Sequence, residues 1–424
     1  MAGMPAPVPA DWHARGQRVL ARPCRPVNGA PVERALNAEL WTRDGRRHID
    51  FSARAGVIGH RHPQVVAAML RELRDPRSSQ ACAALEPDAI RLAERLAVLP
   101  DHGPTRRVAL HGSDAEALES AVMLARRYTG RPALLAFSGS THGHSHLTLA
   151  LSGRRHSHKA AGGAYPSYVH HLPFPHASLG VSLHETRRAF ELLTQATIAS
   201  SDIAAIVIEP IQRDGGILPC SAELLSYLRD LCDAHGIILV ADETRSAPGL
   251  SGRLLASGHF AAEPDLIVMG GPLAGGMPLA AMIGKTVVMD SMPDGLSTGE
   301  VNTLALAAAH AVLDVVEQTG LRERAIALGR HWTDRMHGLA PTRLTLDVRG
   351  LGAMRGVELR DSAGAPAAAQ AHAICDACRE QGLILQPAGP KDNVVPFLFP
   401  LTTELAVLDE ALDIFADALR RTGN

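Results

Sequence analysis

The sequence predicts an α/β fold built on a mostly parallel β-sheet. From about residue 60 onward, short apolar segments alternate with helical patterns. The apolar segments are continuous, which is typical of parallel strands that are covered on both faces. Glycine and polar residues follow these segments directly, as expected where ligands bind at the carboxyl ends of a parallel sheet.

The predicted elements follow one another in a regular order. Residues 1 to about 45 are rich in Pro and Arg, and 41–45 form a predicted hairpin turn. Helices are predicted at Pro63–Leu73, Asp88–Leu99 and Ala115–Tyr128. Strands are predicted at Val108–Leu110, Ala133–Phe137, Ala204–Ile208, Gly236–Ala241, Leu266–Met269 and Leu279–Ile283.

The pattern changes after about residue 330. Strands are predicted at Leu344–Val348, Gly356–Leu359 and Val394–Leu398, and an amphipathic helix is predicted to end near Arg420. This pattern indicates a small α+β domain. We therefore predict an N-terminal segment (1–60) that contributes to the small domain, a large α/β domain (61–330) and a C-terminal small domain (331–424).

Composition excludes several classes of partner. The chain has 424 residues, 46% hydrophobic and 20% charged, and a formal net charge of -2. This balance gives no electrostatic basis for binding nucleic acid or an anionic membrane. No apolar stretch reaches the roughly 18 residues of a membrane span, and the N-terminus lacks the apolar core of a signal peptide. We expect a cytoplasmic protein whose ligand is a small molecule.

The loops and their order resemble the class III aminotransferases, of the 4-aminobutyrate and ornithine type, from about residue 40 to residue 420. The matching segments are Asp50–Ala53, Gly59–Pro63, Ala115–Val122, Ala136–Gly139, Ile208–Gln212, Ala241–Glu243, Glu263–Leu266, Leu273–Leu279, Val348–Gly352 and Pro400–Leu401. The resemblance implies fold type I of the pyridoxal-phosphate-dependent transferases. This fold has a large domain with a mostly parallel seven-stranded sheet, and a small α+β domain from the N- and C-terminal segments.

The resemblance also implies a cofactor site and a homodimer. In this family a buried carboxylate keeps the pyridine nitrogen of the cofactor protonated, and Asp242 matches that position. Helix N-terminal N–H groups and a hydroxyl from the neighbouring subunit hold the phosphate, and Ser113 and Thr298 match those positions. Asp114 stands where the family usually has glycine, and its carboxylate would repel a phosphate unless it points away.

Other pocket positions depart from the family together. Gly271 occupies the position of the lysine that forms the Schiff base. The remaining departures are Thr141 for the ring-stacking aromatic residue, Thr244 for the apolar residue on the other ring face, Arg245 for glutamine, and Leu250 and Pro396 for arginines. The framework positions have kept family identity while the pocket has changed, which favours a changed or lost activity.

The candidate catalytic residues are Arg245, Glu300 and His142. Glu300 lies two residues after Thr298 in a loop expected to cross the dimer interface, where it is either an ion-pair partner of Arg245 or part of a new acid–base pair. His142, His144 and His146 alternate, but side chains two apart diverge in a loop or helix, so we predict no metal site. The three lysines, Lys159, Lys285 and Lys391, are expected at the surface.

Three functional hypotheses remain open. The leading one is a repurposed enzyme of a specialised biosynthetic pathway, which binds a small carboxylate- or amine-bearing metabolite through Arg245 without an internal aldimine. A variant of it keeps pyridoxal or pyridoxamine phosphate as a noncovalent ligand, with no covalent cofactor. The second is a non-catalytic subunit that partners an active aminotransferase. The third is a functioning aminotransferase with an unorthodox active site.

Overall fold

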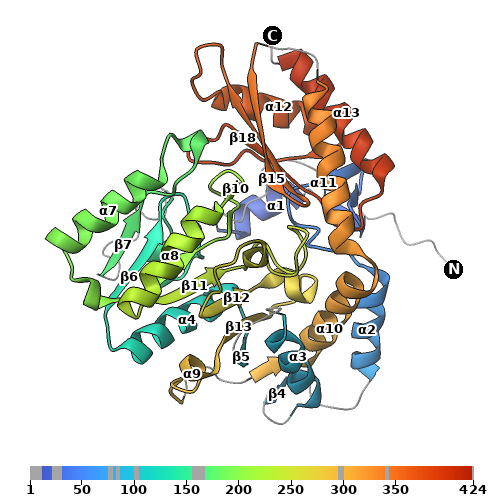
Figure 1. Cartoon of the computed structure of the whole chain (residues 1–424). Coiled ribbons are helices and arrows are strands. Elements are labelled where there is room, and N and C mark those ends of the chain that lie inside the picture. The colour runs from blue at the N-terminus through green and yellow to red at the C-terminus, as the bar shows by residue number, and fades with distance from the viewer. Residues whose placement is uncertain are drawn as a thin grey trace.

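The computed structural model describes residues 12–21, 31–74, 80–82, 86–99, 105–154, 168–294, 300–339 and 343–422. Two residues named above, Thr298 and Lys159, lie outside these ranges. The chain forms a large α/β body and a smaller layer of strands and helices beside it (Figure 1).

A seven-stranded sheet forms the centre of the large body, in the order β5-β13-β12-β11-β8-β6-β7. Its strands are β5 (Arg106–His111), β6 (Ala133–Phe137), β7 (Val169–Leu172), β8 (Ile203–Ile208), β11 (Ile238–Asp242), β12 (Leu266–Met269) and β13 (Ala280–Lys285). Only β13 runs antiparallel to its neighbours, so the predicted mostly parallel sheet is confirmed.

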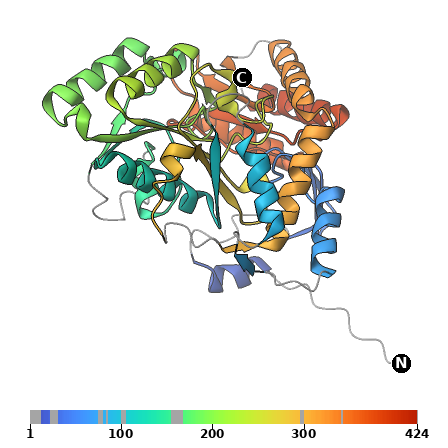
Figure 2. The same ribbon diagram turned by 60° about the horizontal axis from the view of Figure 1, so that its bottom comes forward.

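Helices cover both faces of this sheet, as Figure 2 shows. Successive residues of β11 belong to different core clusters: Val240 packs with Leu118 of α4, and Leu239 packs with Leu228 of α8. Because neighbouring side chains of a strand point to opposite faces, α4 and α8 lie on opposite sides of the sheet. The helices of the large body are α2 (Pro63–Arg74), α3 (Pro87–Ala97), α4 (Asp114–Thr129), α5 (His146–Leu151), α7 (Leu183–Ala196), α8 (Ala222–His235), α9 (Thr286–Met289) and α10 (Thr303–Gln318).

Two small sheets form the second layer and join distant parts of the chain. One has the order β1-β2-β3-β17, and the other β15-β16-β18. The N-terminal strand β3 pairs in parallel with the C-terminal strand β17, so both ends of the chain build this layer. Its elements are β1 (Val32–Leu36), β2 (Glu39–Thr42), β3 (Arg47–Asp50), β15 (Thr345–Leu351), β16 (Met354–Arg360), β17 (Leu383–Ile384), β18 (Val394–Leu398), α11 (Leu321–His337), α12 (Ala368–Glu380) and α13 (Leu405–Thr422).

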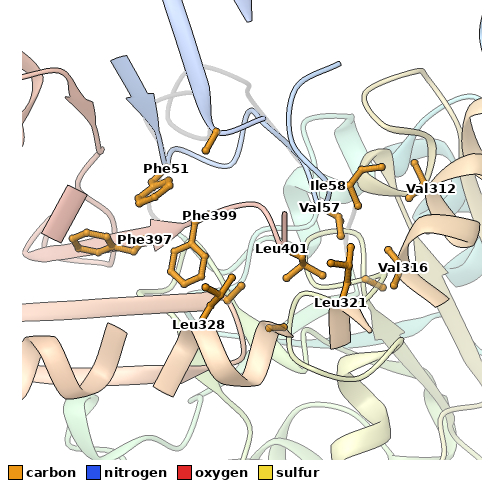
Figure 3. Packing of buried hydrophobic residues seen from close by; sticks show 14 of the residues in the cluster. Phe51, Val57, Ile58, Val312, Val316, Leu321, Leu328, Phe397, Phe399 and Leu401 are labelled. Atoms are coloured by element: carbon orange, nitrogen blue, oxygen red, sulfur yellow. The ribbon is translucent and has the colours of Figure 1, made fainter. Parts of the chain in front are cut away.

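A buried apolar cluster joins the two layers. Phe51 and Phe399 have ring centroids 5.5 Å apart, and Phe397 packs against Trp332 at 5.3 Å. Figure 3 shows Phe51, Phe397 and Phe399 in one continuous cluster with Val312 and Val316 of α10. This apolar contact holds the N-terminal segment, the C-terminal strand and the large body together.

Shorter elements complete the described structure: α1 (Trp12–Val19), β4 (Gln80–Cys82), β9 (Ile211–Gln212), β10 (Leu218–Pro219) and β14 (Glu300–Asn302). In the described part of the chain, no single helix is long and apolar enough to cross a membrane. The pair Thr303–Gln318 and Leu321–His337, bent by 68°, passes that test only when taken together.

Candidate functional site

The candidate residues gather at the carboxyl ends of four adjacent strands. In the sheet order β12-β11-β8-β6, each strand leads directly into a loop that holds a candidate residue or a carboxylate. Asp242 ends β11, Gly271 comes two residues after the end of β12, and Glu209 directly follows β8. Because these strands are parallel and adjacent, their loops meet at one edge of the sheet.

Asp242 and His142 form a buried pair. His142 Nδ1 lies 2.7 Å from Asp242 Oδ2, and both side chains are 0% exposed. The other oxygen, Oδ1, accepts hydrogen bonds from the backbone N–H of Thr244 at 3.0 Å and from its hydroxyl at 2.6 Å. The imidazole and the Thr244 hydroxyl therefore satisfy both oxygens of this carboxylate within the chain itself.

This arrangement does not fit a pyridine ring. The ring nitrogen of pyridoxal phosphate would have to touch a carboxylate oxygen of Asp242, yet that side chain has no surface open even to water. Thr141 and Thr244, which match the positions on the two ring faces, are each 4% exposed. A ring could reach Asp242 only if these side chains moved.

Asp114 stands where the family usually has glycine, beside Ser113 at the start of α4. It is the first residue of α4, and its Oδ1 accepts the backbone N–H of Gly271 at 2.8 Å. Burial raises the pKa of Asp114, against the opposing effects of the Gly271 N–H and of the charge on Arg245. The carboxylate therefore does not point away from the site. Ser113 caps α4 by accepting the backbone N–H of Glu116 at 3.2 Å.

Glu209 is a second buried carboxylate at this edge. Its Oε2 accepts the backbone N–H of Thr141 at 3.0 Å. Burial, and then the charge of Asp242, raise the pKa of Glu209 well above its ordinary value, which favours a neutral carboxyl. Within the described residues, Glu209 Oε1, Thr141 Oγ1 and His142 Nε2 are buried without a hydrogen-bond partner.

Arg245 is a half-buried cation among these carboxylates. Its charge opposes the burial that raises the pKa of Asp114 and Glu209, and it adds to the effect of Arg213 in lowering the pKa of Asp214. In the part of the chain that the structure describes, its guanidinium has no hydrogen bond and no salt bridge. Asp214 is instead paired with Arg213 at 2.9 Å. Among the described residues, Arg245 is therefore a cation of this site without a direct anionic partner.

Glu300 is exposed on β14, where it pairs in register with Cys82 of β4. Within one chain, the charge of Arg245 acts on Asp114, Glu209 and Asp214. The described residues include no group of three or more His, Cys, Asp or Glu side chains placed to hold a metal ion.

Sequence reasoning assigned no role to Glu209 or Asp214. Glu209 carried a usable signal, because it is a carboxylate directly after a fully apolar strand. Asp214 had no comparable signal, since its place near Arg245 depends on the turn that follows β9.

The two lysines in the described part of the chain, Lys285 and Lys391, are not among the residues at this edge of the sheet. Lys285 forms an ion pair with Asp265 at 2.6 Å, and Lys391 is exposed in a turn. The ammonium of Lys285 is therefore paired with the carboxylate of Asp265.

Comparisons with known proteins agree with the architecture. The family model described as Aminotransferase class-III matches residues 20–419. The chain is 37% identical over 395 residues to the 4-aminobutyrate aminotransferase GabT of Escherichia coli, covering 91% of this chain and 92% of the relative. It is 35% identical over 405 residues to a 2-aminoadipate transaminase of Pseudomonas putida, covering 93% and 96%.

Solved structures show the same fold. An amine transaminase from an uncultivated Pseudomonas species, in its PLP-bound internal-aldimine form, matches with a TM-score of 0.83 and 25% identity, over 93% of this chain and 96% of that one. The PMP-bound aminotransferase of Vibrio fluvialis matches with a TM-score of 0.86 and 20% identity, over 98% and 99%. With the family model and the relatives above, these likenesses show that the chain belongs to the class III aminotransferase family.

Proposed function

We propose that this chain is a repurposed class III aminotransferase, an enzyme of a specialised biosynthetic pathway that acts without an internal aldimine. Its substrate is a small metabolite that carries a carboxylate or an amine. The observation that carries this proposal is Gly271 at the position that matches the family's Schiff-base lysine. Glycine has neither an amine to form the covalent link nor a group to move protons afterwards.

The surroundings of Gly271 support the proposal. Its N–H is held by Asp114, and a Cβ at residue 271 would lie 3.9 Å from Asp114 Oδ1. A side chain at this position is therefore not sterically excluded, so backbone crowding gives no reason for the glycine. Lys285 is held by Asp265, which leaves it unavailable as a substitute amine.

Arg245 is the group that we propose holds the substrate. A half-buried guanidinium keeps its charge at all physiological pH values, and it is stabilised by an anionic partner in direct contact. Three carboxylates lie within electrostatic reach but none forms a salt bridge with it. A substrate carboxylate would supply that partner, and Asp114 would face an amine on the same molecule.

Arg245→Ala tests this assignment, with Arg245→Lys and Arg253→Ala as comparisons. Relatives of this chain are named for 2-aminoadipate, 4-aminobutyrate and 5-aminovalerate, so these three compounds are the first probes. We expect at least one probe to raise the melting temperature of the wild-type protein. Arg245→Ala should abolish that shift, and Arg245→Lys should weaken it because lysine lacks the planar bidentate geometry.

The control is an exposed arginine close by in sequence. Arg253→Ala should keep the ligand shift, because its side chain lies on the surface. A ligand shift that survives in Arg245→Ala would contradict the assignment. The assignment would also be contradicted if Arg245→Ala lowered the melting temperature of the free protein but left the ligand-induced shift unchanged. Arg245 would then have a structural role.

A second candidate is a non-catalytic subunit that partners an active aminotransferase. The contacts of Asp242 with His142 and Thr244 favour this candidate. They satisfy the Asp242 carboxylate within the chain, so it needs no ligand. An obligate complex with an active relative, together with no ligand shift for the isolated chain, would support this candidate over the first.

A further inference from the structure

The carboxylate of Asp114 lies directly over the Gly270–Gly271 peptide. Its Oδ1 accepts the Gly271 N–H at 2.8 Å. A Cβ built on Gly270 would come within 2.5 Å of the same oxygen and 2.9 Å of Oδ2. Any side chain at residue 270 would therefore collide with this carboxylate, which is packed against the backbone that follows β12.

The same carboxylate lies at the N-terminus of α4. Such a terminus presents unpaired N–H groups and a partial positive charge, which together favour an anion. Here side-chain oxygens of the chain itself accept hydrogen bonds from the backbone N–H groups around the start of α4. Ser113 Oγ accepts the backbone N–H of Glu116, and Glu116 Oε2 accepts that of Gly112 at 3.0 Å.

We propose that Asp114 takes the place of the cofactor phosphate, and that it is the residue that makes this site select against phosphorylated ligands. A phosphate at the start of α4 would face the Asp114 carboxylate, and would compete with it for the Gly271 N–H. Asp114 and Gly271, which both differ from the residues usual in the family, are hydrogen-bonded to each other. We therefore treat the two substitutions as coupled. This inference rests on the proposed function, in which the site works without a phosphorylated covalent cofactor.

Inorganic phosphate is the probe, and the stabilisation it gives is measured by thermal unfolding. A ligand that binds only the folded state raises stability with its concentration relative to its Kd. The wild-type protein should respond to sodium phosphate no more than to sodium chloride of equal ionic strength. Asp114→Gly removes the charge and frees the N–H groups, so it should gain a saturable response and bind phosphate about tenfold or more tightly.

Two further variants separate charge from fold. Asp114→Asn removes the charge but retains an oxygen that can accept the Gly271 N–H, so it should fold normally and gain part of the phosphate response. Glu223→Gln removes an acidic residue from the first turn of α8, another helix, and should behave as the wild type.

The results of the phosphate experiment can be told apart from the results that test the proposed function. If neither Asp114 variant gains phosphate affinity, or if the wild type already saturates with phosphate, the assignment of Asp114 is wrong. The proposed function fails on a different result, a covalent cofactor adduct on the wild-type chain. Each claim can therefore fail while the other stands.

Discussion

Glu209 shows how burial determines the chemistry of single residues at this site. The carboxylate is 2% exposed and has one hydrogen-bond donor, the backbone N–H of Thr141. The two oxygens of the Asp242 carboxylate are instead satisfied by His142 and Thr244. Burial raises the pKa of Glu209, which favours its protonated form, and among the described residues Arg245 has no hydrogen bond and no salt bridge.

Glu209 also makes a testable contribution to the pH dependence of stability. Its pKa is raised in the folded state above the ordinary value of 4.5, mainly by burial. The unfolded chain therefore loses this proton first as pH rises, so folding stability decreases as pH rises from that ordinary value toward the raised pKa. In Glu209→Gln, urea unfolding across this range should show a flatter pH dependence, with stability at neutral pH equal to or above that of the wild type.

The control for this prediction is Glu191→Gln, which changes an exposed residue of α7 and should keep the wild-type pH profile. If Glu209→Gln lost stability at neutral pH and kept the wild-type slope, Glu209 would be ionised in the folded protein.

At the scale of elements, β18 connects the small layer to the helices behind it. Phe397 is fully buried, and its ring centroid lies 5.3 Å from that of Trp332 on α11 and 5.1 Å from that of Phe415 on α13. One side chain thus joins a strand and two helices from separate parts of the C-terminal segment.

Phe397→Ala should lower the free energy of unfolding by about 3–5 kcal/mol, because it removes buried surface and leaves a cavity between fixed elements. Leu405→Ala, at the exposed start of α13, should change it by less than about 0.5 kcal/mol. Equilibrium urea unfolding measures both. Similar effects of the two substitutions would mean that the β18 cluster does not hold the small layer in place.

Elements were more predictable from sequence than contacts. Strands such as Ala133–Phe137 and Leu266–Met269 were predicted with their bounds, because continuous apolar runs mark fully buried strands. The edge strand β7 was not predicted, because it is only partly buried and contains His170 and His171. The bond between Asp114 and Gly271 spans 157 positions, and local sequence carries no information on the direction of that side chain.

At the scale of the whole molecule, we expect a homodimer. Helices α2 and α3 both pack on α10, and they leave large apolar side chains open to solvent. Leu73 is 64% exposed and Val98, at the end of α3, is 72% exposed. Exposed apolar groups on neighbouring elements are typical of a protein interface.

Sedimentation at micromolar concentration should therefore show a dimer. A Leu73→Asp and Val98→Asp double variant should shift it toward monomer, because the charges would be buried in the interface. Val287→Asp, an exposed apolar position on α9, is the matched control and should leave the dimer intact. A wild-type protein that stays monomeric at micromolar concentration would contradict the expectation.

The central claim is that this member of the family works without a Schiff base to its own chain. The most direct test is to incubate the purified protein with excess pyridoxal phosphate, reduce it with borohydride, and measure the intact mass and the peptide map. The account predicts an unchanged chain mass beyond trace modification. A stoichiometric pyridoxyl group on Lys159, Lys285 or Lys391 would contradict it, because one of the three lysines would then have taken over the role missing at Gly271.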